Sequence, residues 1–405
     1  MKMPSALQSV KTKIQALAIE NLKEVIHIRR HLHQHPELSF QEIKTSQYIA
    51  QKLKEYGIEF KIGYVKTGIV AIIKGKNPSK NIIALRADMD ALPITEENNV
   101  PYCSKNKGSM HACGHDVHSA SLLGTAKILH KLRNEFEGTV KLMFQPGEEV
   151  LPGGASLMIQ EGALKNPAPK SIYAQHVFPS MEAGKVGFKK GMYMASTDEL
   201  YLTVVGKGGH AAMPAEYINP ILIASEILLA LNTKFMIPKK KGTAIPTVLA
   251  FGKVNANGAT NVIPEKIFIE GTFRTMDEKW RKVAHIKMKK IAREIAVKRG
   301  GKCIFEVRKG YPYLVNDELL TTRSIGYAID YLGKNNVEEL PLRMTAEDFA
   351  YYSQVMPACF YRLGTANKNK GITSGVHTPT FDIDENALLV SSGLMAWMAI
   401  NELSA

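Results

Sequence analysis

Residues 82–90 read IIALRADMD, so that an apolar run leads directly into charged side chains. A similar change from apolar to polar residues recurs at residues 140–149, VKLMFQPGEE, and at residues 172–176, IYAQH. Helical stretches, such as residues 117–132, alternate with these short apolar runs. This alternation predicts an α/β domain in which a mostly parallel central sheet is flanked by helices.

The N-terminal part of this domain is predicted to begin with two helices. Apolar residues recur at helical spacing over the first thirty residues, which indicates one long amphipathic helix. A second helix is expected to end at Gly57, with Ser39 and Glu42 forming a capping box at its start. Short β-rich runs then follow between residues 58 and 85.

A different order of elements is expected between residues 187 and 310. The pattern predicts a strand, a helix, two strands, a helix and a strand, at residues 200–205, 220–231, 247–254, 267–275, 278–297 and 303–307. That order is typical of a ferredoxin-like α+β module. The sequence therefore predicts one domain formed by residues 1–186 and 311–405, and a second domain, residues 187–310, inserted into it.

The net charge of +14 lies almost wholly in the predicted insertion. Between Lys185 and Lys309 there are 23 Lys and Arg against 10 Asp and Glu, a difference of +13, which leaves +1 for all other residues. Three explanations are open: a solvated basic face on the helix at residues 279–299, attraction of small anionic substrates, or nucleic-acid binding. Nucleic acid is not an expected partner, because no aromatic stacking platform is interleaved with the basic residues.

Composition excludes several classes of protein. Of the 405 residues, 45% are hydrophobic and 22% are charged, which is unlike a disordered, collagen-like or coiled-coil chain and typical of a soluble globular protein. No apolar run approaches the roughly 20 residues that a membrane span requires. The cysteines are too few for a disulfide scaffold and fit a reducing compartment: Cys103, Cys113, Cys303 and Cys359. We therefore expect a cytoplasmic protein with no membrane partner.

Side chains that can bind metals follow the predicted strands. In an open α/β sheet, ligands bind beyond the carboxyl ends of the strands. The polar side chains at residues 86–90, 145–149 and 175–176 are therefore expected to meet there. The loop at residues 111–116, HACGHD, and His377 add further donors. The donors available to one site are then Cys113, His115, Glu149, His176 and His377.

This set of donors predicts the type of metal centre. Imidazole, thiolate and carboxylate groups suit a borderline-soft divalent ion such as zinc, and manganese, nickel and cobalt are open alternatives. Five donors are too many for one catalytic ion that keeps an open position. A two-metal site with a shared bridging ligand is therefore predicted.

Several motifs run in order across nearly the whole chain. They are 29–37 (RRHLHQHPE), 86–93 (RADMDALP), 111–116 (HACGHD), 144–149 (FQPGEE), 208–214 (GGHAAMP), 261–264 (NVIP), 346–349 (AEDF) and 377–379 (HTP). Together they resemble the metallo-aminoacylase/carboxypeptidase family. Within it they match the amidohydrolase branch, which includes N-acyl-L-amino acid amidohydrolases, hippurate hydrolases and auxin-conjugate hydrolases. Each motif alone is weak, whereas the ordered set is highly specific.

The resemblance implies that the α/β domain is a catalytic, metal-binding domain. Two divalent ions are expected to be held by the residues at the matching positions, with the cysteine as the bridging ligand: Cys113, His115, Glu149, His176 and His377. Glu148 matches the general base, and Asp90 matches the carboxylate that orients a ligand histidine. Relatives outside the branch have a ligand histidine where this chain has Asp88, so Asp88 is left out of the set. His118 is expected to be structural, at the start of a helix.

The resemblance assigns the inserted domain to dimerisation and to a lid. His210 matches a histidine that reaches the active site of the partner subunit, where an imidazole can donate to an oxyanion. Asn261 and Arg274 match positions near the substrate carboxylate, and a solvent-facing position on a strand is the open alternative for Arg274. A homodimer through this domain is therefore expected.

Taken together, these residues predict a dinuclear metal-dependent amidohydrolase. The expected reaction cleaves the amide bond of an N-acyl-L-amino acid, hippurate-like or N-acetylated, to a carboxylic acid and a free amino acid. A metallo-dipeptidase or carboxypeptidase, or an N-acetyl-diaminopimelate deacetylase, would use the same chemistry and is the alternative. A catalytically silent binding protein is disfavoured, because Glu148 and every ligand are present.

Overall fold

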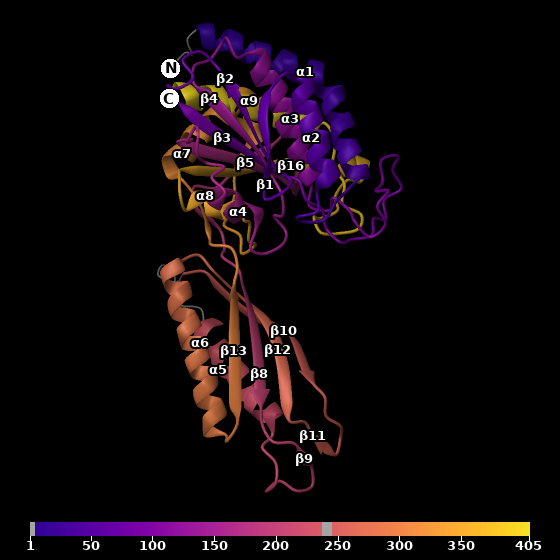
Figure 1. Cartoon of the computed structure of the whole chain (residues 1–405), viewed down its shortest axis with the longest axis vertical. Coiled ribbons are helices and arrows are strands. Elements are labelled where there is room, and N and C mark those ends of the chain that lie inside the picture. Colours follow the sequence, from indigo (N-terminus) through magenta and orange to yellow (C-terminus); the bar gives the residue numbers. More distant parts are fainter. Residues whose placement is uncertain (1–4, 237–244) are drawn as a thin grey trace. The chain divides into compact units, whose positions relative to one another are not determined.

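The computed structural model describes residues 5–236 and 245–405, which fall into two compact units (Figure 1). The large unit consists of the described residues up to 191 together with 315–341 and 351–405. The small unit consists of the described residues of 192–314 together with 342–350. Each unit has a hydrophobic core of its own.

The large unit is built on an eight-stranded sheet. Its strands, in spatial order, are β1 (Glu59–Tyr64), β2 (Gly68–Lys74), β4 (Thr139–Gln145), β3 (Ile82–Asp88), β5 (Ser171–Glu182), β16 (Ala358–Ala366), β6 (Val186–Phe188) and β15 (Val337–Glu339). The neighbours β4, β3, β5 and β16 run parallel, whereas β1, β2 and β4 are joined antiparallel at one edge. Beyond β16, β6 lies antiparallel to it and parallel to β15. The expected α/β fold with a mostly parallel central sheet is confirmed.

Helices flank this sheet. Those of the large unit are α1 (Ser5–Gln34), α2 (Ile43–Glu55), α3 (His115–Lys131), α4 (Gly154–Gln160), α7 (Glu318–Leu332) and α9 (Ala387–Ser404), with short 3-10 turns at Lys334–Asn336 and Lys368–Lys370. α1, α3 and α9 pack against one another, and α3 and α9 both contact β3. Buried side chains of these elements, among them Ile14, Leu85 and Trp397, belong to one core. This core supports the strand ends that carry the candidate site.

α9 is the one helix among the described residues that is long and apolar enough to cross a membrane. However, 78% of its 18 residues are buried inside the protein, where the helix packs against α1, α3 and α7. The segment escapes a search for continuous apolar runs because Ser391 and Ser392 interrupt it. Its burial identifies α9 as a core helix.

The start of α2 differs from the prediction. Glu42 stands at the N-cap position, but within the described residues its side chain makes no capping bond. Glu37 instead accepts hydrogen bonds from Thr45 N at 2.8 Å and from Thr45 Oγ1 at 3.0 Å. The predicted capping box is wrong, because Ser39 and Glu42 bond to groups of the site described below.

The small unit contains a four-stranded antiparallel sheet and two helices. Its elements along the chain are β8 (Asp198–Val205), α5 (Pro220–Met236), β10 (Thr247–Ala256), β12 (Lys266–Thr275), α6 (Glu278–Lys298) and β13 (Lys302–Lys309). The strands lie in the order β10-β12-β8-β13, and α5 and α6 pack against the sheet and against each other. This is the predicted ferredoxin-like arrangement. β9 (Gly209–His210) and β11 (Val262–Ile263) form a separate two-stranded ribbon.

The small unit differs from the predicted insertion at 187–310: it begins at residue 192, continues to residue 314 and includes one further segment. Residues 342–350, which the sequence assigned to the large domain, belong to the small unit. Ala195 N donates to the carbonyl oxygens of Arg343 and Thr345, and this pairing ties the segment to the start of the unit. A local pattern does not reveal such a long-range pairing. The chain passes between the two units near β7 (Gly191–Met194), β14 (Leu314–Asn316) and α8 (Ala350–Ser353).

Candidate metal centre

The five side chains predicted to bind metal lie together in the large unit. Cys113 Sγ lies 3.4 Å from His176 Nε2 and 3.2 Å from His377 Nε2. His377 Nε2 is 3.4 Å from Glu149 Oε1, which lies 3.9 Å from His115 Nε2. The structure thus brings the whole predicted ligand set into one cluster, in which Cys113 contacts two histidines.

These side chains come from segments far apart in the sequence. Cys113 lies in the loop before α3, and His115 is the first residue of that helix. Glu149 follows the end of β4, at the carboxyl edge of the parallel strands. His176 was expected just after a strand, but it lies inside β5 because this strand continues to Glu182.

His377 lies in the loop after β16 with a backbone φ of 62°. This left-handed conformation costs a residue with a side chain roughly 1–2 kcal/mol. His377 N donates to Ala112 O at 2.8 Å, which ties the loop to the residue next to Cys113. Residues held in such conformations cluster at functional sites, and here the conformation places His377 Nε2 beside Cys113 and Glu149.

Two buried side-chain atoms of the cluster, each able to bind a metal, have no hydrogen-bond partner among the described residues. They are His115 Nε2 and Glu149 Oε1, which lie 3.9 Å apart. Leaving a buried polar atom unpaired costs about 1–3 kcal/mol, more for a charged group. A divalent cation would satisfy both atoms, and the surrounding imidazole, thiol and carboxylate groups are the donors that such an ion prefers. The residues therefore fit a metal centre.

Asp90 fixes the orientation of two of these donors. Its Oδ1 accepts from His115 Nδ1 at 3.1 Å, so that Nε2 is the ring nitrogen that carries the lone pair when His115 is neutral, the form that binds a metal. Its Oδ2 accepts from Glu149 N at 3.0 Å and from Ser39 Oγ at 2.6 Å. Asp90 therefore orients two of the predicted ligands, His115 through its ring and Glu149 through its backbone.

The pKa values in the cluster reflect an excess of negative charge. Burial lowers the pKa of His115, but the neighbouring carboxylates, Asp88 first, raise it to about 10. Burial, together with Glu149, raises the pKa of the Cys113 thiol well above its ordinary value. The neighbouring carboxylates thus favour a positive charge at His115, as they would favour a bound divalent cation, whereas burial and Arg362 lower the pKa of His176 well below its ordinary value.

His118 and Asp88 lie next to the cluster and satisfy each other. His118 Nδ1 donates to Asp88 Oδ1 at 2.6 Å, and His118 Nε2 accepts from Val177 N at 2.9 Å. Asp88 Oδ2 accepts from an Arg86 N–H at 2.5 Å. Although Asp88, His115 and His118 are close enough to hold an ion together, both ring nitrogens of His118 are already occupied. Their bonds give His118 and Asp88 a structural role.

Glu148 and Glu149 follow a tight turn after β4. Gly147 has a φ of 63°, and a Cβ atom at this position would lie 2.3 Å from the Phe40 ring, so that only glycine fits. Glu148 is 7% exposed, and its carboxylate forms a group with His115 and Glu149 in which the donor atoms lie within 4.8 Å of one another. The predicted general base thus lies beside two of the predicted ligands.

The three predicted substrate-binding residues lie in the small unit, and they do not form one cluster. His210 and Asn261 are neighbours, because Ala211 N donates to Asn261 O at 3.0 Å. Arg274 lies near the end of β12, where it donates to Met344 O at 3.1 Å. β12 begins at Lys266, and at about 3.3 Å per residue this strand separates Arg274 from the His210 ribbon by more than 20 Å.

Two residues at the metal centre were not predicted to belong to it. Ser39 Oγ donates to Asp90, and Glu42 Oε1 accepts from Gly147 N at 2.9 Å. The signal was present as the motif at residues 39–42, SFQE, which also satisfies the pattern of a local capping box. Sequence spacing alone does not separate these two uses of the same residues.

Comparisons with known proteins agree with this site. The family model described as peptidase family M20/M25/M40 matches residues 84–399. An N-acetylcysteine deacetylase of Bacillus subtilis is 38% identical over 381 residues, covering 93% of this chain and 96% of that protein. An N-acyl-L-amino acid amidohydrolase of Geobacillus stearothermophilus is 40% identical over 306 residues, covering 76% of this chain and 81% of that protein.

A solved structure extends the similarity to the whole fold. The YXEP protein of Bacillus subtilis, described as a dinuclear metal binding peptidase from the M20 family, is 35% identical to this chain with a TM-score of 0.80. The similarity covers 95% of this chain and 98% of that one.

Proposed function

Because the chain belongs to peptidase family M20/M25/M40, we propose that it is a dinuclear metal-dependent amidohydrolase that cleaves N-acyl-L-amino acids to a carboxylic acid and a free amino acid. The observation that carries the proposal is the convergence of five metal donors with Glu148 beside them. The expected hydrolase acting on linear amides is confirmed at the level of the family, whose members include amidohydrolases and deacetylases.

The proposed cofactor is a pair of divalent ions in each chain. Cys113 would bridge them, with the other four ligands shared between them: His115, Glu149, His176 and His377. Zinc and manganese are the first candidates, and nickel and cobalt suit the same donors. When bound, such ions lower the pKa of a water molecule and polarise the scissile carbonyl.

Glu148 carries the proton transfers in this proposal. Its carboxylate takes a proton from the attacking water as the new C–O bond forms, and it returns this proton to the amine nitrogen as the C–N bond breaks. Asp90 keeps His115 in the tautomer whose Nε2 can bind metal, through the 3.1 Å bond to Nδ1. The burial of Glu148 supports this role, because a nearly dry carboxylate exchanges protons with the reacting groups rather than with bulk water.

His210, Asn261 and Arg274 are proposed to bind the substrate, and two subunits to share this task. His210 Nδ1 accepts from Ala212 N at 3.1 Å, which leaves the ring proton on Nε2, where it can donate to an oxyanion. Since His210 and Arg274 lie at opposite ends of β12, a homodimer would let His210 serve the partner subunit while Arg274 serves its own substrate carboxylate.

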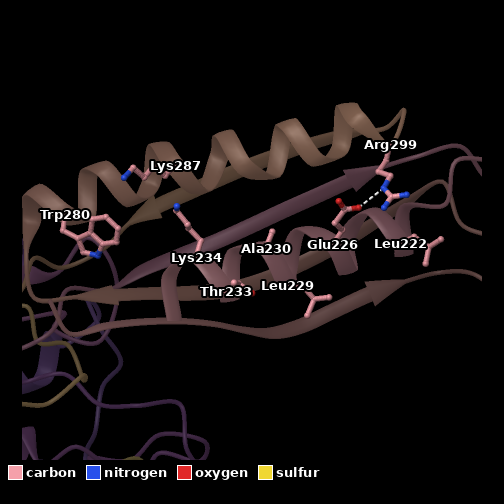
Figure 2. A pocket seen from close by; sticks show the side chains of 9 residues that line it. All are labelled: Leu222, Glu226, Leu229, Ala230, Thr233, Lys234, Trp280, Lys287 and Arg299. Carbon is pink, nitrogen blue, oxygen red and sulfur yellow. Dashed lines mark hydrogen bonds and ion pairs between the residues drawn. The ribbon is translucent and has the colours of Figure 1, made fainter. Parts of the chain in front are cut away.

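The proposed dimer uses the β10 side of the small unit. β10 and β13 are the two edge strands, and an exposed edge is a template for pairing with another chain. β13 reads KCIFEVRK and is protected by its charges, whereas β10 reads TVLAFGKVNA with a single lysine. Beside it, α5 exposes Leu222 and Leu229, which line a groove of about 960 Å³ between α5 and α6 (Figure 2).

A change of charge in this groove tests the dimer. Leu229 is 69% exposed, so Leu229→Asp leaves the fold intact and should halve the mass measured by sedimentation velocity. Leu319→Asp, at a residue that is 74% exposed on α7, is the matched control and should leave the mass unchanged. A wild-type chain that sediments as a monomer of 44.8 kDa would end the proposal.

N-acyl amino acids are the proposed class of substrate, and the cytoplasm is the proposed location. The Bacillus subtilis deacetylase supports N-acetyl amino acids as substrates, and the Geobacillus amidohydrolase supports N-acyl amino acids more broadly. The cysteines are free, which supports a reducing compartment and hence the cytoplasm: Cys103, Cys113, Cys303 and Cys359.

A panel of substrates tests the proposed reaction. Acetyl, benzoyl and indole-acetyl amino acids and a dipeptide are each assayed with the free α-carboxylate and with its amide. We expect turnover of N-acyl amino acids that depends on the free carboxylate, and a loss of at least about 100-fold in kcat for Glu148→Gln. Full activity of Glu148→Gln on every substrate would remove the assigned base.

A further inference from the structure

The segment Ser39–Glu42 makes its contacts at the metal centre rather than at the start of α2. Ser39 Oγ donates to Asp90 Oδ2 at 2.6 Å, the same oxygen that accepts from Glu149 N at 3.0 Å. Glu42 is fully buried, and α2 takes its capping bonds from Glu37 instead. Capping of α2 therefore does not explain the presence of these two polar side chains, Ser39 and Glu42.

Glu42 joins this segment to the turn that carries Glu148. Its Oε1 accepts from Phe40 N at 2.8 Å and from Gly147 N at 2.9 Å. Its Oε2 accepts from Thr67 Oγ1 at 3.0 Å. One buried carboxyl oxygen thus accepts hydrogen bonds from the backbone of both segments.

The ring of Phe40 also packs against the turn at Gly147. It has a φ of 64°, which is rare for a bulky residue and needs surroundings that hold it. The bond from Phe40 N to Glu42 is one such restraint. In this conformation the ring covers Gly147 so closely that a Cβ atom there would lie 2.3 Å from it. The turn therefore cannot shift toward Phe40 without a clash, or away from Glu42 without losing a hydrogen bond.

We propose that Ser39, Phe40 and Glu42 form a positioning clamp that sets the turn at Gly147, and with it the carboxylates of Glu148 and Glu149 at the metal centre. This inference rests on the proposed function. The clamp residues bind neither metal nor substrate; they act through Gly147 and Asp90. Without the clamp, the ligand and the general base lose their fixed distance from the other donors, and metal affinity and kcat fall together.

The test compares Glu42→Ala with Glu42→Gln. Alanine removes the acceptor for Gly147 N and Phe40 N, whereas glutamine keeps one oxygen for both and can donate its amide to Thr67 Oγ1. Zinc affinity is measured by competition with a chromophoric chelator, and kcat and KM on an N-acetyl amino acid. We expect Glu42→Ala to bind zinc about 10- to 100-fold more weakly and to lose kcat with little change in KM, and Glu42→Gln to remain within about threefold of wild type.

Glu37→Ala is the matched control for stability. It removes the capping bonds to Thr45 and so lowers the thermal midpoint, but it leaves the turn at Gly147 untouched. We expect its zinc affinity to equal that of the wild type. Equal losses of affinity in Glu37→Ala and Glu42→Ala would show a general effect of stability and overturn the clamp.

Ser39→Ala provides a second variant, because it removes one partly buried hydroxyl contact and leaves the Glu42 bonds in place. A zinc affinity about fivefold below wild type is expected, from the loss of one hydrogen bond of ordinary strength that orients Asp90. Wild-type affinity in both Ser39→Ala and Glu42→Ala would overturn the clamp alone. A wild-type chain that binds no zinc would overturn the proposed function and the clamp with it.

Discussion

Asp90→Asn is the substitution whose effect follows most directly from the geometry. The Asp90 carboxylate accepts three hydrogen bonds, from His115 Nδ1 at 3.1 Å, Ser39 Oγ at 2.6 Å and Glu149 N at 3.0 Å. Asparagine keeps the shape but has one oxygen, so its NH2 group must face one side of this network. If it faces His115, two donors meet and the ring proton moves to Nε2. If it faces Glu149, a backbone N–H is left unpaired.

Either arrangement weakens the metal centre. Changing a residue that orients a metal ligand typically costs 10- to 100-fold in affinity. At about 1.36 kcal/mol for each factor of ten, this is about 1.4–2.7 kcal/mol. Zinc affinity, measured by chelator competition, should fall by that factor in Asp90→Asn.

The control makes the same Asp-to-Asn change at a residue outside the cluster. Asp330→Asn alters a carboxylate that pairs with Lys11 at 3.1 Å on the helices of the large unit, and it should leave zinc affinity unchanged. Zinc affinity of Asp90→Asn within twofold of wild type would refute the assignment of Asp90 as the residue that orients His115.

Three other changes have defined outcomes. Gly147→Ala should lower the free energy of unfolding in urea by roughly 1–3 kcal/mol and abolish turnover, because a Cβ atom there meets Phe40 and strains a φ of 63°. Burial raises the pKa of Glu96, but hydrogen bonding and charge from His33 hold it at about 2, below its ordinary 4.5. A lowered carboxyl pKa stabilises the fold above pH 4.5, and this contribution is lost as the pH falls toward 2, so unfolding of Glu96→Gln in urea should depend less steeply on pH in that window. Zinc at 100 times its Kd should stabilise the wild type by about 2.7 kcal/mol for each bound ion in the same assay, and Cys113→Ser should gain much less.

The sequence predicted the parts of the fold that depend on local patterns. The alternation of helices and apolar strands predicted the mostly parallel central sheet. The order of elements after residue 187 predicted the ferredoxin-like module. It also pointed to five residues in ordered motifs, Cys113 and Glu149 among them, and the fold brings each of the five within 3.9 Å of another.

What the sequence did not predict depends on contacts between distant segments. Glu42 looked like part of a capping box, but its bond to Gly147 spans 105 positions. His176 was expected after a strand, because the pairing of β5 with β16 that extends the strand is not local. Residues 342–350 join the small unit through Ala195, and no composition or periodicity marks that partnership.

The number of divalent ions that a chain retains is the most direct test of the proposed dinuclear centre. Zinc-loaded protein is freed of excess metal, and its zinc content is measured by inductively coupled plasma mass spectrometry for the wild type and for Cys113→Ser. We predict two ions per wild-type chain and at most one in Cys113→Ser, since Cys113 lies 3.4 Å and 3.2 Å from two of the other donors and is assigned as the bridge. A wild-type chain that retains one ion or none, or a Cys113→Ser chain that retains two, would contradict the dinuclear centre described here.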